Sequence, residues 1–240
     1  MIVANFPATP NRPLSPRKRL WHNWAIINPI TERSAMHTPR KGNVFIVSAA
    51  SGTGKTTLVS RLLNNHPDIR VSVSHTTRAP RPGEIHGQHY YFVDPARFQT
   101  LVGESAFLEH ARVFDNYYGT SIEGVNILRE QGFDVILEID IQGAEQVRRS
   151  LPEACSIFIL PPSFEILAER LRGRATDSDE VIAKRLSKAR HEIEQAFLFD
   201  YVVVNEDLVA AEIDLLHIIK SYRLKQSSQQ LFIEQLLENS

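Results

Sequence analysis

The chain has 240 residues, and its composition and charge exclude several classes of protein. A hydrophobic fraction of 42% is enough to form a folded core and excludes a chain that is largely disordered. The one cysteine, Cys155, excludes an intrachain disulfide framework and fits a reducing compartment such as the cytoplasm. The longest apolar runs, such as 44–47 and 157–160, have the length of strands, whereas a membrane span needs roughly 18 apolar residues.

The net charge of −1 is unevenly distributed along the chain. Residues 1–41 contain seven of the 27 Lys and Arg residues but only one of the 28 acidic residues, so the remainder is acidic. A basic N-terminal segment on an acidic body is not the pattern of a nucleic-acid-binding enzyme. We therefore expect no nucleic-acid partner and no membrane partner, and any site for a polyanion must be local.

Residues 1–41 also contain six of the 13 prolines and show no helical or strand period. This composition predicts a mostly disordered basic extension. Arg-rich, acid-poor N-termini occur in targeting peptides, but the prolines disfavour the amphipathic helix that such a peptide needs. Because Met36 lies just before the first predicted strand, an upstream start site or an added tag is a further explanation.

From Gly42 onward, strand-like and helix-like patterns alternate. The apolar run "NVFIVSA" predicts a strand buried on both faces, and "KTTLVSRLLNNH" predicts the helix that follows it. Further strands are predicted within 133–141, 156–160 and 201–205, and helices within 144–150, 164–172, 180–199 and 208–224. Strands that alternate with helices predict an α/β fold with a parallel sheet. Between Ser72 and Glu123 the composition shifts to Pro, Gly, His and Tyr, which predicts a smaller inserted lobe.

A C-terminal helix is predicted beyond this core. Its apolar side chains would pack either on the body or on a second subunit, so the sequence leaves a homo-oligomer open. These side chains are Leu231, Phe232, Leu236 and Leu237.

The stretch "VSAASGTGKTTL" resembles a phosphate-binding loop but departs from the usual G-x-x-x-x-G-K-[ST] spacing. Counting back from Gly54 places Ala49 where the first glycine is expected. The departure is tolerable only if position 49 has backbone angles that an L-residue allows. The alternative is an ordinary turn between a strand and a helix, but such a turn has no reason to place Lys-Thr after the second glycine.

The chemistry of this loop lies in four residues. Gly52 and Gly54 can adopt angles closed to other residues, so that their amides and the helix dipole surround a phosphate. Lys55 would reach the outer phosphates, and the Thr56 hydroxyl would bind Mg²⁺.

The stretch "VILEID" predicts a buried strand that ends in carboxylates. In parallel α/β sheets a carboxylate at this end commonly assists a metal ion or its waters, which makes Asp140 a candidate, with Glu138 on the same side of the strand. Asp140 could instead cap the helix that follows, and the two roles are compatible.

Within the predicted lobe, Arg78 and Arg81 flank Pro80. Two guanidinium groups held close together suit a dianionic phosphate, although a solvated turn is the simpler interpretation of the pattern alone. Phenolic donors follow at Tyr90, Tyr91, Tyr117 and Tyr118.

These stretches together resemble the guanylate kinase family over roughly residues 42–225. The matching strings are "SGTGKTT", "SVSHTTRAPRPGE", "HGQHYYFV", "FLEHARVFDNYYGTS", "LEIDIQGAEQVR", "SIFILPPS" and "RLRGRATDSDEVIAKRL". TTRxPRxGE and NYYGT are far more specific than the loop. The resemblance implies a P-loop NTPase three-layer α/β fold with a parallel central sheet, an inserted NMP-binding lobe and a helical lid. It also implies Mg²⁺-dependent phosphorylation of GMP or dGMP by ATP in purine nucleotide metabolism.

The resemblance also implies roles for individual residues. ATP would bind at Ala49, Ala50, Ser51, Gly52, Thr53, Gly54, Lys55, Thr56 and Thr57. Guanine would contact Ser74, Glu109 and Asp140, and the GMP phosphate would contact Arg78, Arg81, Tyr90 and Tyr118, with Thr120 alongside. The catalytic cations would be Lys55, Arg78, Arg81, Arg174 and Arg185, and Mg²⁺ would bind Thr56, with Asp140 acting through water.

The division of the chain follows from the same resemblance. The core would comprise 42–73, 124–169 and 191–225, the GMP-binding lobe 74–123, the lid 170–190 and the C-terminal helix 226–240. The chain departs from the family at Ala49 and Ala50, where Gly-Pro or Ala-Pro is frequent, and at Glu138, where Asp is usual.

Two alternatives remain beside this assignment. One is another nucleoside monophosphate kinase, or a kinase of a phosphorylated sugar, on the same scaffold. The other is a non-catalytic protein-binding domain. The second is disfavoured because Lys55, Thr56, Arg78, Arg81, Arg174 and Arg185 are all present.

Overall fold

The computed structural model describes residues 40–113, 115–173 and 179–238, which belong to one compact unit, 38–240. The predicted N-terminal extension therefore lies almost wholly outside the described residues, and so does Arg174. In the part of the chain that is described, no helix is both long and apolar enough to cross a membrane.

The central sheet has five strands in the order β2-β7-β1-β8-β9, and every neighbouring pair is parallel. The strands are β1 (Val44–Ala49), β2 (Ile69–Val71), β7 (Asp134–Glu138), β8 (Cys155–Leu160) and β9 (Tyr201–Val204). The predicted parallel α/β sheet is confirmed, with β1 at its centre.

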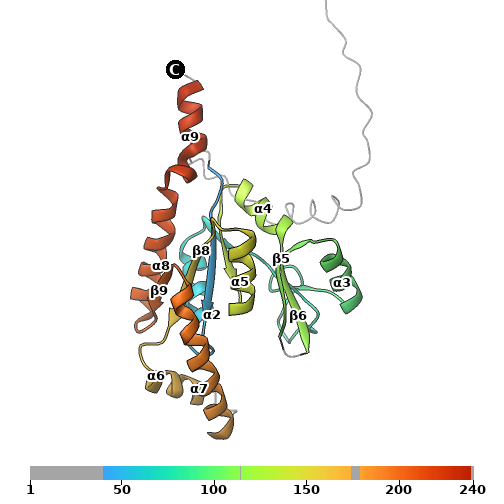
Figure 1. Cartoon of the computed structure of the whole chain (residues 1–240), viewed down its shortest axis with the longest axis vertical. Coiled ribbons are helices and arrows are strands. Elements are labelled where there is room, and N and C mark those ends of the chain that lie inside the picture. Colours follow the sequence, from blue (N-terminus) through green and yellow to red (C-terminus); the bar gives the residue numbers. More distant parts are fainter. Residues whose placement is uncertain (1–39, 114, 174–178, 239–240) are drawn as a thin grey trace, which may run out of the picture. The chain divides into compact units, whose positions relative to one another are not determined.

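Helices cover both faces of this sheet, giving three layers (Figure 1). Because successive strand residues point to opposite faces, Phe45 and Val47 pack with α2 (Lys55–Asn65) and α8 (Leu208–Arg223). Val44 and Ile46 pack on the other face with α4 (Ile122–Glu130) and α5 (Ile141–Ser150). All four strand residues are at most 2% exposed, so β1 is buried on both faces as its apolar run predicts.

A second sheet of four strands, in the order β4-β3-β6-β5, lies in the stretch whose composition differs. Its strands are β3 (His75–Thr76), β4 (Tyr91–Phe92), β5 (Phe107–Val113) and β6 (Asn116–Ser121). The helix α3 (Pro95–Gly103), which the sequence pattern did not predict, begins at Asp94, whose side chain accepts from the Arg97 amide. Phe98 of α3 is fully buried and stacks on Phe107 and Tyr117.

The remaining helices agree closely with the sequence pattern. The predicted helix 164–172 is α6 (Phe164–Arg172), and the predicted helix 180–199 is α7 (Asp179–Glu194) followed by a 3₁₀ turn, η1 (Gln195–Leu198). The predicted C-terminal helix is α9 (Gln226–Glu238). None of its residues is buried, and Leu236 and Leu237 are 61% and 70% exposed.

A buried carboxylate, Asp134 at the start of β7, joins three parts of the core. It accepts from the Arg40 guanidinium at 2.9 Å, the Asn43 amide at 2.9 Å and Arg223 Nε of α8 at 2.6 Å. Burial alone would raise the pKa of Asp134, but the hydrogen bonds from Arg40 and Asn43 and the charge of Arg223 lower it below its ordinary value.

We expect Asp134→Asn to lower the free energy of unfolding by about 3 kcal/mol, because it removes the buried carboxylate that pairs with Arg40 and leaves Arg223 with Asp68 alone. Since the pKa of Asp134 is depressed in the folded state, the stabilisation is complete above its unfolded pKa of about 4 and disappears as pH falls through the lower folded value. Urea unfolding at pH 7 and pH 3 measures both effects. Asp214→Asn, at an exposed position of α8, is the control. Equal free energies of unfolding for the two variants at pH 7 would contradict the claim that Asp134 stabilises the core.

Candidate active site

The loop between β1 and α2 has the backbone of a phosphate-binding loop. Gly52 and Gly54 have φ values of 91° and 90°, in the region that favours glycine. Ala49 is the last residue of β1, paired with Ile159 of β8, so its backbone is extended. An alanine at position 49 is therefore tolerated, because an L-residue allows these backbone angles.

Both glycines are also required by close packing. A Cβ on Gly54 would lie 2.7 Å from Asn205 Nδ2, and one on Gly52 would lie 2.8 Å from Leu171 of α6. Gly54 is the N-cap of α2, and no side chain caps the helix there. The positive end of this helix therefore faces the loop without a local side-chain acceptor.

Lys55 and Thr56, the first residues of α2, face the end of β7. Lys55 Nζ donates to the Ile139 carbonyl at 3.2 Å and lies 3.8 Å from Glu138. Burial lowers the pKa of Lys55, while the charges of Glu138 and Asp140 oppose that shift. Thr56 Oγ1 donates to Glu138 Oε1 at 2.5 Å, so the carboxylate beside the Thr56 hydroxyl is that of Glu138.

Asp140 caps α5, since its Oδ1 accepts from the Gly143 amide at 2.9 Å. Within the described residues, no cluster of three His, Cys, Asp or Glu side chains could enclose a metal ion. Mg²⁺ usually keeps several waters and binds one or two protein oxygens together with substrate phosphates. The hydroxyl of Thr56 and the carboxylate of Glu138 are oxygen donors of this kind, so the residues present fit Mg²⁺.

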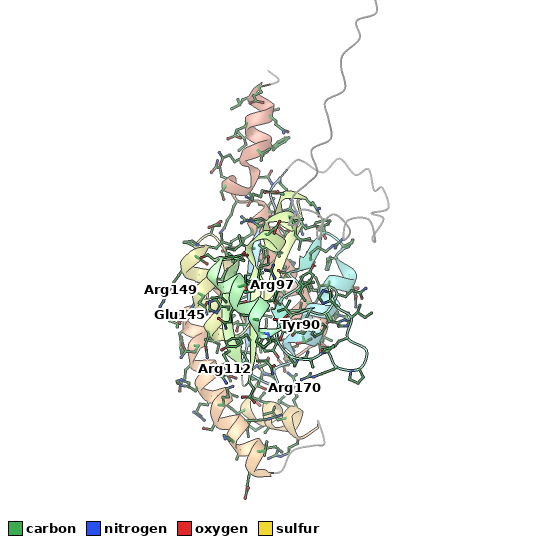
Figure 2. All side chains as sticks on the ribbon, turned by 90° about the vertical axis from the view of Figure 1, so that its right-hand side faces the viewer. Tyr90, Arg97, Arg112, Glu145, Arg149 and Arg170 are labelled. Carbon is green, nitrogen blue, oxygen red and sulfur yellow. The ribbon has the colours of Figure 1, made fainter. Side chains whose placement is uncertain are left out.

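The loop also receives two contacts that the sequence did not predict. The Ser51 amide donates to the Glu192 carboxylate of α7 at 3.0 Å. Arg170 of α6 donates to the Thr53 carbonyl at 3.1 Å (Figure 2). Both partners are more than a hundred residues away in sequence, so no local pattern could have identified them.

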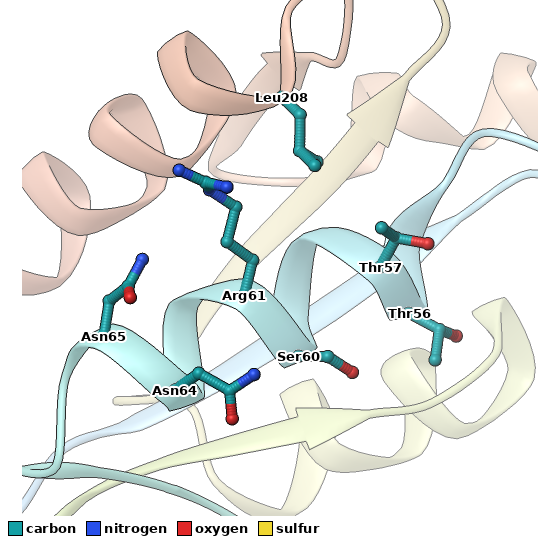
Figure 3. Close-up of a pocket in the computed structure, with 7 residues that line it drawn as sticks. All are labelled: Thr56, Thr57, Ser60, Arg61, Asn64, Asn65 and Leu208. Carbon is teal, nitrogen blue, oxygen red and sulfur yellow. The ribbon is translucent and has the colours of Figure 1, made fainter.

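An open groove of about 620 Å³ begins beside the loop and follows α2 (Figure 3). Six of its seven lining residues are polar, and Thr56 and Thr57 lie at the end next to the loop. The other lining residues are Ser60, Arg61, Asn64, Asn65 and Leu208.

A second group of predicted residues gathers around Glu109 of β5, which is only 4% exposed. The hydroxyl of Thr120 on β6 donates to Glu109 Oε1 at 2.6 Å. A Cβ on Gly143 of α5 would lie 2.8 Å from Glu109 Oε2 and 3.4 Å from Asp140 Oδ1, which places both carboxylates beside the first turn of α5. Burial, reinforced by the charge of Asp140, raises the pKa of Glu109 to about 7.

A third group surrounds Arg78, after β3. Its guanidinium donates to Glu84 at 2.7 Å and lies over the ring of Tyr90, 5.5 Å from the ring centroid. The rings of Tyr90 and Tyr118 are 5.9 Å apart. Hydrogen bonding to Arg78 lowers the pKa of Glu84 to about 2, so this pair stays ionised. Sequence reasoning assigned Glu84 no role, although it lies in the most specific string.

The other predicted residues are less closely tied to these groups. Ser74 directly precedes β3, and its carbonyl accepts from the Tyr91 amide. Arg81 is exposed, and its backbone amide donates to Glu84 at 2.7 Å. Arg185 lies half-buried on α7, and Arg174 lies outside the described residues.

Glu109 generates a prediction about stability. Because its folded pKa is raised, its contribution to stability is fully present below its unfolded pKa of about 4.3 and is lost as pH rises through about 7. Glu109→Gln, which is always neutral, should therefore raise the free energy of unfolding at pH 8.5 by about 2–3 kcal/mol and change it little at pH 4. Urea unfolding at both pH values measures the difference. Glu130→Gln, at an exposed position of α4, should not raise the free energy of unfolding at pH 8.5. If Glu109→Gln does not raise it either, the claim that Glu109 is buried and neutral near pH 7 is contradicted.

Comparisons with known proteins agree with this geometry. The family model described as guanylate kinase matches residues 41–222. A guanylate kinase of Neisseria gonorrhoeae is 68% identical over 205 residues, which are 85% of this chain and all of that protein. A guanylate kinase of Salmonella paratyphi A is 54% identical over 191 residues, covering 79% of this chain and 92% of the relative.

A solved structure extends the agreement to the backbone. The crystal structure of a guanylate kinase from Anaplasma phagocytophilum matches 79% of this chain and 90% of its own, with 34% identity and a TM-score of 0.64. The parallel three-layer core is thus the P-loop NTPase fold of that structure, and the chain belongs to the guanylate kinase family.

Proposed function

We propose that the chain is an ATP:GMP phosphotransferase, which converts ATP and GMP, or dGMP, to ADP and GDP, or dGDP. Family membership supports the activity, with ATP as the phosphoryl donor. The observation that carries the assignment to guanine is the buried Glu109 carboxyl beside Asp140, which directly follows the Ile139 carbonyl that Lys55 contacts. The buried free thiol of Cys155 fits a cytoplasmic location.

The donor would bind at residues 49–57. Phosphate would be surrounded by the amides of the loop and the first turn of α2, where the helix dipole is positive. Lys55 would neutralise the outer phosphates, and Thr56, with Glu138 acting through water, would hold Mg²⁺. The ion supplies positive charge to the transferring group and its leaving oxygen. The Glu192 carboxylate, which holds the Ser51 amide in this structure, would then compete with ATP for that amide.

Glu109 would select the acceptor. Guanine presents two adjacent donors, N1–H and the 2-amino group, which a carboxylate can accept together. Adenine lacks this pair and would leave a buried acceptor unpaired, at a cost of about 1–3 kcal/mol or more. The hydroxyl of Thr120 donates to Glu109. This hydrogen bond supports a role for Thr120 in orienting the carboxylate, in addition to its predicted place near the GMP phosphate. Asp140 and Ser74 would complete the guanine contacts.

The phosphate of GMP would bind Arg78, Arg81, Tyr90 and Tyr118. The Arg78–Glu84 pair and the packing on Tyr90 support this assignment, because they fix the guanidinium before the phosphate arrives.

Closure of two segments would complete the site. We assign 74–123 as the GMP-binding lobe and 170–190 as the lid, from which Arg174 and Arg185 would reach the transferred group. Closure would exclude the water that would otherwise accept the phosphoryl group.

A coupled assay of ADP release tests the activity. With Mg²⁺ and ATP, GMP should support turnover at least about 100-fold faster than AMP, because only guanine satisfies Glu109. Lys55→Ala should lower kcat by on the order of 100-fold or more. Lys220→Ala, at an exposed lysine of α8 outside the lobe and the lid, should leave the rate unchanged. Equal turnover of GMP and AMP would contradict the proposal and favour another monophosphate kinase.

Removing the charge of Glu109 tests the guanine assignment separately. Glu109→Gln keeps an acceptor for Thr120 but can no longer accept two donors from guanine, so kcat/KM for GMP should fall by on the order of 100-fold or more. KM for ATP should stay within a factor of about two. Glu130→Gln serves again as the control. A loss shared equally by the two substrates would show that Glu109 does not read the base.

A further inference from the structure

The strand that carries Glu109 lies at the edge of its sheet. Among the strands that the structure describes, β5 pairs only with β6, so the backbone groups of its other edge face no neighbouring strand. Gln146 of α5 occupies this edge at His110. Its Oε1 accepts from the His110 amide at 3.1 Å, and its Nε2 donates to the His110 carbonyl at 3.0 Å. One side-chain amide thus bonds both backbone groups of one residue, as an adjacent strand would.

This pair of hydrogen bonds acts directly beside the Glu109 carboxyl group. The His110 amide belongs to the peptide group that joins Glu109 to His110, so a partner on that amide restricts rotation about the Glu109 Cα–C bond. On β6, the Thr120 hydroxyl donates to the Glu109 side chain. Glu109 is therefore held by β6 through its side chain and by α5 through its backbone.

The residues of α5 that shape this region follow one another along one side of the helix. Asp140 caps the helix. Gly143 leaves room for the Glu109 carboxylate, because a Cβ there would lie 2.8 Å from Glu109 Oε2. Gln146 then contacts β5. The three positions are three residues apart, so all of them face the same neighbour.

Apolar packing supports the contact between β5 and α5 but cannot define it alone. Leu108, next to Glu109, packs on the buried cluster that contains Ala144 and Val147 of α5. Apolar burial is non-directional, so it brings the strand to the helix without fixing the strand along it. Hydrogen bonds are directional, and the two that Gln146 makes therefore set the place of β5 along α5.

We propose that Gln146 is a positioning residue for the choice of base: by holding β5 on α5 at His110, it keeps the Glu109 carboxyl beside Asp140, where guanine would be recognised. The inference rests on the proposed role of Glu109 in selecting GMP. It assigns Gln146 no contact with either substrate. The effect of Gln146 should therefore appear in the choice of acceptor and not in the use of ATP.

The geometry requires an amide at position 146. Glutamine offers an acceptor and a donor on one planar group, whereas leucine offers neither at a similar size and helix propensity. Gln146→Leu therefore removes both hydrogen bonds. Gln146→Glu keeps an acceptor for the His110 amide but cannot donate to the His110 carbonyl when it is ionised, so its effect should be intermediate.

Steady-state kinetics with GMP and with AMP, at saturating ATP and Mg²⁺, test the proposal. Gln146→Leu should lower kcat/KM for GMP about tenfold and leave kcat/KM for AMP within a factor of about two, because AMP does not use Glu109. The ratio of the two values should therefore fall about tenfold, while KM for ATP stays within a factor of about two. Glu145→Gln is the matched control, since its exposed carboxylate on the same helix pairs with Arg149 (Figure 2).

Thermal unfolding shows whether each variant is folded, and Gln146→Glu decides the matter if Gln146→Leu is not. The proposal is overturned if the folded variant keeps the wild-type ratio of GMP to AMP, as Glu145→Gln should. It is also overturned if both nucleotides lose kcat/KM equally, which would indicate a general structural role. A wild type that does not prefer GMP would instead contradict the proposed function itself, and the inference would fail with it.

Discussion

The site depends on one constraint, that the carboxyl ends of parallel strands meet at the same edge of a sheet. The loop follows β1, Glu138 ends β7, and Asn205 follows β9, so three distant segments reach a single place. Packing on both faces of β1 holds that edge rigid. The amides of the loop can then be fixed before any nucleotide arrives, and phosphoryl transfer relies mainly on such positioning and on positive charge.

The proposed guanine site follows a different physical principle, the burial of a carboxyl group. Glu109 lies between β6 and α5, where the Thr120 hydroxyl donates to it. This hydrogen bond does not offset the cost of burying the ionised carboxylate, so the pKa is raised. A base that brings two donors supplies what the free protein lacks, and a base without them does not. The buried Glu109 therefore lowers the free energy of unfolding at neutral pH, at the position where the proposed function needs selectivity.

Sequence reasoning succeeded where the physical cause is local. Apolar runs predicted four strands of the central sheet, the Gly52–Gly54 spacing predicted the loop, and the place of Asp140 between a strand and a helix allowed a helix cap. It missed β2, α3 and α4, and α3 begins at Asp94-Pro95 within a stretch in which no helix was predicted. It could not find Glu192 or Arg170, whose partners are 141 and 117 residues away, because only the fold brings them together. The roles that the family resemblance implies for individual residues, Arg174 and Arg185 among them, remain predictions.

The most direct test of the account is the titration of the Glu109 carboxyl by ¹³C NMR, in the free protein and with saturating GMP or AMP. Without ligand the pKa should be about 7, as burial dictates. GMP should lower it toward the ordinary value of a glutamate, because two guanine donors stabilise the carboxylate, whereas AMP should leave it unchanged. An ordinary pKa in the free protein, or the same shift with both nucleotides, would contradict the claim that Glu109 recognises guanine.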